Sequence, residues 1–190
     1  MTAAMHLPRF SVRQRITLGV NRYEIHATTP EGREGELMAF AQQKRFAFKE
    51  EVTFYTDDSR SRRVFSFKAR QRLDVGAQYD VLDEAGTPLG VFAKKFGASL
   101  LRSTWTIAVP GLEATGRERS VAVALLRRAT DDLPLPFHFD FTDDAGGGPV
   151  MSSDRKWSLR DRYDVVVPDT RLDFRVAAAM AVALDALQER

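Results

Sequence analysis

The sequence predicts a mainly β domain, a barrel or a sandwich, that encloses one C-terminal helix. Two observations carry this prediction. Up to about residue 115, short segments alternate between apolar and polar residues, and turn-forming residues separate them about every ten positions. Near the C-terminus, residues 176–184 are apolar without interruption.

Length and composition fit a single folded domain over residues 1–190. The chain has 190 residues, no Cys and 44% hydrophobic residues. A chain of this length buries about 70% of its unfolded surface, so it needs no disulfide or metal to hold it together. These values exclude collagen-like, disulfide-rich and wholly disordered classes. No repeat, low-complexity tract or long linker divides the chain.

The N-terminal strands are predicted from alternation with a period of two. In residues 10–18, Phe10, Val12 and Ile16 share one parity, so one face is buried and the other is wet. Residues 84–86 form the turn of a hairpin. On the same grounds, further strands are expected at residues 23–27, 46–48, 52–56, 63–68, 79–83, 88–94 and 103–109.

The pattern changes after residue 111. Residues 118–128 carry an apolar run between arginines, which predicts a short helix, and a strand over residues 120–126 is the alternative. Phe137, Phe139 and Phe141 then alternate in a clear strand. Two more strands are expected at residues 150–157 and 163–167.

The terminal segment, residues 172–187, is predicted to be a buried helix. Asp169 or Thr170 is the expected N-cap, and Asp173 lies where the helix dipole favours a carboxylate. A helix that is apolar on every face must be buried on every face. At about 24 Å it is shorter than the ~30 Å hydrocarbon core of a membrane. Its alanines keep it slim, as a helix enclosed by strands requires.

Six stretches of the chain together resemble a known superfamily. They are residues 46–52, 64–70, 79–86, 89–95 and 101–107, followed by the helix at 169–187. In this order they resemble the tubby C-terminal-like superfamily, in the branch of the LURP-one-related proteins and phospholipid scramblases. The resemblance implies a closed barrel of about 12 antiparallel strands around a central hydrophobic helix, which would leave no exposed strand edge.

The resemblance implies little about ligands. The superfamily includes a phosphoinositide-binding protein and membrane-associated scramblases, but no binding residue can be transferred to this chain. In scramblases an acidic stretch beside the terminal helix is linked to calcium. Asp161, Asp164, Asp169 and Asp173 do not repeat that dense pattern, so the sequence does not favour a calcium site.

A basic stretch is the main functional lead. No acidic residue occurs from position 59 to 73, and Lys68, Arg70 and Arg72 share one parity over roughly 14 Å of strand. Such a row suits an anionic phospholipid or a phosphoinositide headgroup. The alternative is a solvated barrel exterior on which the arginine stems cover apolar surface. The candidate binding residues are Arg60, Arg62, Arg63, Lys68, Arg70 and Arg72.

No motif indicates an enzyme, a metal or a cofactor. The chain has three His residues without zinc spacing, and it lacks a nucleophile elbow, a P-loop and a dinucleotide fingerprint. His26 and His138 alternate with apolar residues and are expected to face solvent. The acidic pairs 57–58, 131–132 and 143–144 fall at predicted turns, where carboxylates are usually solvated.

The net charge and the targeting signals bear on the expected partners and location of the protein. The net charge of +2 does not require nucleic acid, no aromatic series accompanies the basic residues, and no signal peptide or membrane span is evident. We expect a cytoplasmic, non-enzymatic binding domain that is peripheral at a membrane if its ligand is an anionic lipid. A protein-interaction or scaffold domain without a lipid ligand is the alternative.

Overall fold

The computed structural model describes residues 5–17, 20–44, 51–70, 78–95, 104–119, 138–156 and 162–188. These residues form twelve strands and one helix, α2 (Phe174–Gln188). The strands are β1 (Arg9–Thr17), β2 (Val20–Thr28), β3 (Glu34–Lys44), β4 (Glu51–Tyr55), β5 (Arg63–Ala69), β6 (Gln78–Asp83), β7 (Pro88–Lys95), β8 (Thr104–Val109), β9 (Leu112–Glu118), β10 (His138–Asp143), β11 (Pro149–Lys156) and β12 (Arg162–Val166).

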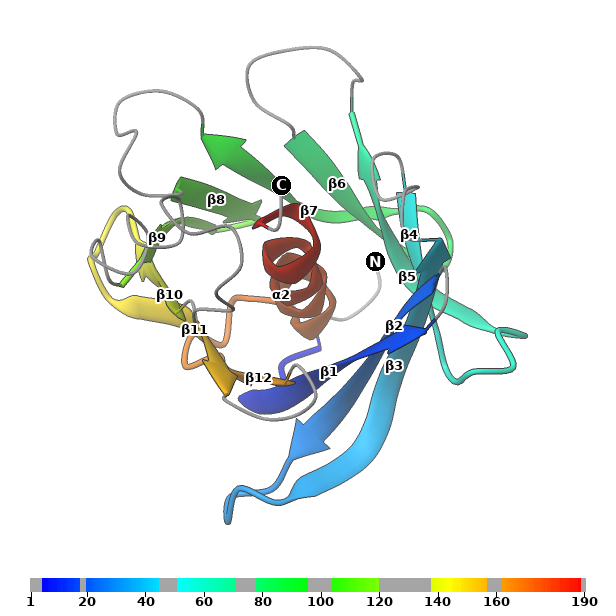
Figure 1. The fold of residues 1–190 in the computed structure, drawn as a ribbon. Helices are drawn as coiled ribbons and strands as arrows, with labels where there is room; N and C mark the ends of the chain where they lie inside the picture. Colours follow the sequence, from blue (N-terminus) through cyan, green and yellow to red (C-terminus); the bar gives the residue numbers. More distant parts are fainter. Residues whose placement is uncertain are drawn as a thin grey trace, which may run out of the picture.

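The strands form a closed antiparallel barrel, as predicted. Each strand pairs with its neighbour in sequence, and β1 closes the barrel by pairing with β12 (Figure 1). The closing register runs from Arg9 opposite Val166 to Arg13 opposite Arg162.

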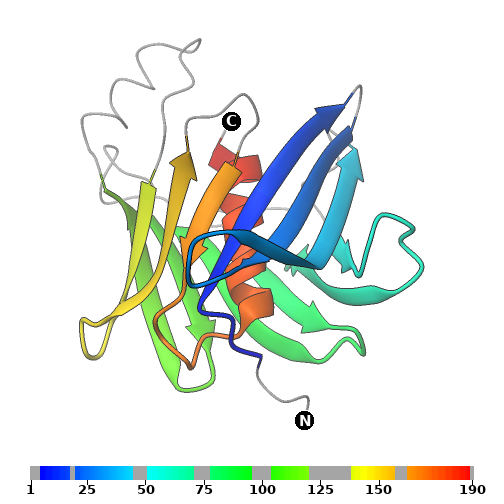
Figure 2. The ribbon, with the colours of Figure 1, turned by 90° about the horizontal axis from the view of Figure 1, so that it is seen from below.

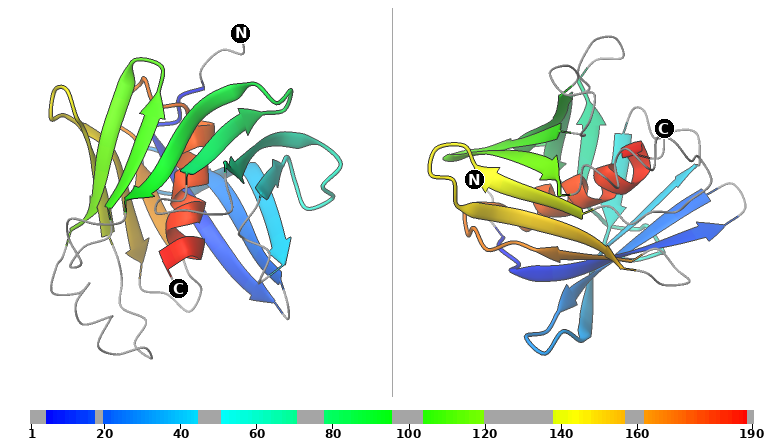
Figure 3. Two further views of the ribbon diagram at one scale, coloured as in Figure 1. Left: turned by 90° about the horizontal axis from the view of Figure 1, so that it is seen from above. Right: turned by 60° about the vertical axis from the view of Figure 1, so that its left-hand side comes forward.

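The helix α2 passes through the barrel, and strands surround it in every view (Figures 2 and 3). Every residue of the apolar run 176–184 is 0% exposed. The prediction that this helix is buried on all sides is therefore confirmed. The segment that leads into β1 and the last turn of α2 lie at opposite ends of the barrel (Figure 3).

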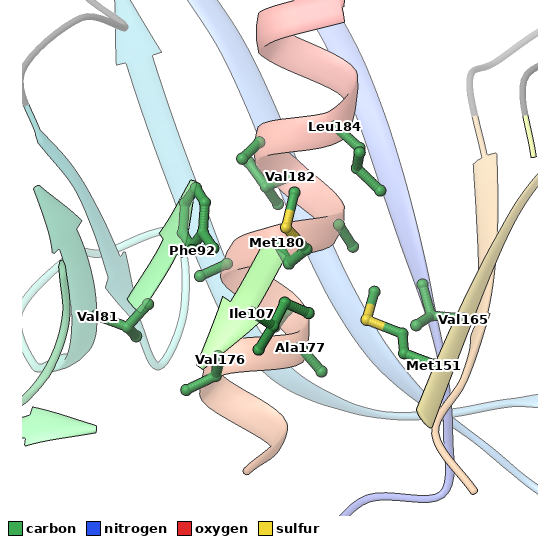
Figure 4. Packing of buried hydrophobic residues seen from close by; sticks show 14 of the residues in the cluster. Val81, Phe92, Ile107, Met151, Val165, Val176, Ala177, Met180, Val182 and Leu184 are labelled. Atoms are coloured by element: carbon green, nitrogen blue, oxygen red, sulfur yellow. The ribbon is translucent and has the colours of Figure 1, made fainter. Parts of the chain in front are cut away.

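Large wall residues fill the space that the slim helix leaves. The helix residues Val176, Met180 and Leu184 lie among wall residues such as Phe92 and Ile107 (Figure 4). Where β7 lies close to the helix, the wall residue is Gly90. A Cβ at this position would lie 3.3 Å from a methyl carbon of Val176 and 2.6 Å from one of Val109, so only glycine fits without displacement.

Two strands were not predicted. In β3 the register shifts twice against β2, which disrupts the period of two. In β9 the inward positions include Ala114 and Gly116, whose small side chains hide the apolar pattern. The Phe141 ring occupies the space of the missing Gly116 side chain, because a Cβ there would lie 2.2 Å from the ring.

Two other predicted elements fall outside the described residues. The strand at 46–48 does so entirely, and so do residues 120–128 of the predicted short helix, together with the alternative strand at 120–126. Glu118 is the last residue of β9, so only the predicted first residue of that helix is corrected.

The start of α2 also differs from the prediction. The N-cap is Asp173, because its carboxylate accepts the Arg175 backbone N–H at 2.8 Å. The same carboxylate accepts the Met5 backbone N–H and two guanidinium N–H groups of Arg175. Burial acts to raise the pKa of Asp173, but these hydrogen bonds outweigh burial and lower the pKa overall. The hydrogen bond from Met5 thereby attaches the segment before β1 to the start of α2.

Enlarging a helix alanine should destabilise the barrel. Ala178→Phe places a large ring where Ala178 is 0% exposed, and we expect overpacking to cost about 1–3 kcal/mol or more of unfolding free energy. Urea denaturation measures this loss. Ala108→Phe, on the exposed face of β8, is the matched control. Equal stability of the two variants would contradict the packing described above.

Candidate anionic-ligand surface

The structure places the predicted basic residues along one hairpin. Arg60 and Arg62 lie in the β4–β5 turn, Arg63 and Lys68 lie on β5, and Arg70 follows directly after it. Arg72 lies outside the described residues. The basic residues therefore do not form one uniform row, because some lie beside acids from neighbouring strands.

Acidic residues of neighbouring strands face Lys68 and Arg70. Lys68 is in register with Glu51 of β4 on one side and with Asp80 of β6 on the other. The Arg70 Nε donates to both carboxylate oxygens of Asp80, at 2.8 and 2.9 Å. This hydrogen bonding raises the pKa of Arg70. The positive charge at this end of the row is thus largely balanced.

Arg60, Arg62 and Arg63, here called the arginine cluster, are less balanced. Arg62 meets Glu84 only at 3.9 Å, between side chains that are 73% and 59% exposed, and such a pair contributes little. Among the described residues, neither Arg60 nor Arg63 has a carboxylate within ion-pair distance. The Arg63 Nη2 donates to the Ser66 Oγ at 2.6 Å, while its buried Nε has no hydrogen-bond partner.

The same hairpin contains two acids. Asp57 accepts hydrogen bonds from the Ser59 N–H and the Thr56 hydroxyl, and the bonds from Ser59 lower its pKa. Asp57 therefore stabilises the turn, and Asp58 is exposed beside it. Arg60 has a φ of 55°, a left-handed conformation that sets its side chain at the tip of the hairpin.

The histidines lie where the sequence predicted. His138 is on the outer face of β10, and its Nδ1 lies 2.9 Å from Asp154. His26 is on the outer face of β2, near Glu24 and Glu34 at 3.8 and 3.7 Å. Both rings face outward, opposite buried neighbours such as Phe139 and Ile25.

A buried polar cluster was not predicted. Asp185, in the last turns of α2, is 0% exposed and accepts hydrogen bonds from the hydroxyls of Tyr23 and Tyr163. The Tyr23 hydroxyl also accepts the Gln14 Nε2 at 3.3 Å. These residues join α2 to β1, β2 and β12. The signal for this cluster in the sequence is weak, because it consists of a charged residue, Asp185, directly after the apolar run.

An open depression of about 490 Å³ lies beside the β8–β9 and β10–β11 turns, at the end of the barrel where α2 begins and opposite the end that holds Asp185. Glu113, Asp143 and Asp144 line it together with Arg171. The Arg171 Nη2 donates to both Asp143 and Asp169 at 2.6 Å. Arg171 thus fastens the segment before the helix to these turns, which is a structural role.

In the part of the chain that the structure describes, no group of three or more His, Cys, Asp or Glu residues could hold a metal ion. No helix within that part is long and apolar enough to cross a membrane.

Comparison with known proteins identifies the family. The family model described as LURP-one-related matches residues 37–185, which is more than half of the chain. The chain belongs to the LURP-one-related family. This LURP-one-related chain matches no curated protein. A solved structure of a protein from Arabidopsis thaliana is 14% identical and covers 97% of this chain and 94% of its own, with a TM-score of 0.37.

The buried cluster should contribute to the stability of this LURP-one-related domain. Tyr23→Phe removes one hydroxyl donor to Asp185, and we expect a loss of about 1–3 kcal/mol in unfolding free energy. Urea denaturation provides the measurement. Tyr55→Phe, at a partly exposed position on β4, is the control. If the two variants unfold at the same urea concentration, the hydroxyl bond to Asp185 contributes no stability.

Proposed function

We propose that the protein is a non-enzymatic, cytoplasmic binding domain that contacts phosphate groups of anionic phospholipid or phosphoinositide headgroups at a membrane surface. The proposed contact is the arginine cluster rather than the whole basic row. The weak charge balance of the cluster carries the argument, because Arg60 and Arg63 have no carboxylate within ion-pair distance among the described residues and Arg62 meets Glu84 only at 3.9 Å.

The chemistry of the arginine cluster supports a phosphate ligand. Guanidinium groups donate in a planar fork that matches phosphate oxygens. Arg60 and Arg62 are exposed on a hairpin that extends away from the barrel (Figure 1), so a flat surface can reach them. Lys68 and Arg70 are less suited, because Glu51 and Asp80 would repel the same phosphate.

The expected affinity is modest. A basic side chain near an anionic membrane contributes about 1 kcal/mol, so three arginines together change membrane partitioning by roughly 100-fold. Salt should weaken the interaction, because exposed charges are screened within a Debye length.

Vesicle flotation tests the proposal. Wild-type protein should float with vesicles that contain phosphatidylserine or a phosphoinositide, and not with neutral phosphatidylcholine vesicles. Arg60→Gln/Arg62→Gln should lose most of this binding without loss of stability, since both side chains are exposed. Lys68→Gln/Arg70→Gln is the control from the charge-balanced end of the row, and it should float nearly as wild type does.

Competition with inorganic phosphate and a soluble inositol phosphate shows whether the phosphate alone or the lipid surface is bound. Displacement by the soluble inositol phosphate indicates a headgroup site, and resistance to it indicates a response to surface charge. Absence of flotation at low salt, or an equal loss in the control variant, would overturn the proposal.

A further inference from the structure

Two hairpins diverge at the end of the barrel where α2 begins. The β2–β3 hairpin and the β4–β5 hairpin point away from each other (Figure 1). Pairing between β3 and β4 is correspondingly short, with Phe40 opposite Tyr55 and Ala41 opposite Phe54. Against β2, in contrast, β3 is paired along its length, from Lys44 to Glu34.

One side of β3 is therefore open. Residues 34–38 are exposed or partly exposed and have no registered strand partner on their other side within the described residues, whereas Ala39 is 0% exposed. This edge departs from the expectation that a closed barrel leaves no exposed strand edge. An extended edge of this kind presents backbone N–H and C=O groups that can pair with another strand. We call residues 34–38 the open edge.

The two hairpins carry net charges of opposite sign. The β2–β3 hairpin carries the exposed Glu31 and Glu36, the exposed Arg33, and Glu34, which pairs with Arg13 at 2.5 Å. The β4–β5 hairpin carries the arginine cluster together with Asp57 and Asp58. Tyr55 is in register with Phe40 on one side and with Arg63 on the other, so the arginine cluster begins two strands away from the upper end of the open edge.

We propose that two copies of this chain associate through their open edges, with β3 of one copy antiparallel to β3 of the other about a two-fold axis. Antiparallel pairing points the hairpin tip of each copy back toward the barrel of the other. The acidic tip then lies at the level of Tyr55 and Arg63, beside the arginine cluster. Two-fold symmetry repeats this contact, so each copy both gives and receives an acidic hairpin.

A second copy is favoured over another peptide because this chain carries both halves of the charge pattern. The edge pairing supplies the association, and the charges select the register and the partner. The inference uses Arg60 and Arg62 but does not depend on the phosphate ligand of the proposed function. If both hold, a second copy and an anionic surface compete for the arginine cluster.

Sedimentation velocity over a wide range of protein concentration tests the association. Wild type should shift from the monomer mass of 21.4 kDa toward twice that mass as concentration rises. Arg60→Glu/Arg62→Glu and Glu31→Arg each place like charges in contact, so each variant alone should remain monomeric. All three positions are exposed, so folding should be unaffected.

Sedimentation of an equimolar mixture of the two variants is the decisive measurement. In the mixed pair both contacts regain opposite charges, so the mixture should form dimers while neither variant does alone. A wild type that remains monomeric at every concentration overturns the inference, and so does a mixture that stays monomeric. Vesicle flotation of Glu31→Gln separates the two proposals, because this variant removes the acidic group of the hairpin tip without adding a basic one and retains the arginine cluster, so it should still bind anionic lipid.

Discussion

The whole structure depends on filling the interior of a twelve-strand barrel. Side chains alone fill a barrel of about eight strands, and a wider barrel needs something more inside it. Here α2 supplies that filling, with an alanine-rich surface slim enough to pass between aromatic wall residues. Phe174 packs edge-on against both Phe10 of β1 and Phe65 of β5, so one helix residue contacts distant parts of the wall.

Polar contacts at both ends fix the position of this helix along the barrel. At its start, Asp173 binds Arg175 and the Met5 backbone. Near its end, Asp185 accepts two tyrosine hydroxyls from β2 and β12. Because α2 packs closely against the wall, displacing it would cost packing contacts, and it would also move the buried Asp185 away from the tyrosine hydroxyls. Asp173 and Asp185 thus flank the apolar run and fix the position of α2 along the barrel.

Sequence reasoning recovers the fold where one local pattern decides it. The period of two marks most strands, and the uninterrupted apolar run marks the enclosed helix. It fails where a strand is defined by its pairing and not by a local pattern of residues. The register shifts of β3 and the small inward residues of β9 are the two cases. The same limit applies to the binding surface. No acid occurs from position 59 to 73, but strand pairing brings Glu51 and Asp80 beside Lys68 and Arg70.

The surfaces assigned to binding lie on hairpins that extend beyond the barrel, so their charges can vary without disturbing the core. The central claim concerns the core itself, and native-state hydrogen exchange of the α2 amides tests it most directly. If the helix is what the barrel closes around, its amides exchange only through global unfolding. Their opening free energies should then equal the unfolding free energy from urea denaturation. Exchange of the 176–184 amides at a clearly lower free energy, with the strands still protected, would contradict this account.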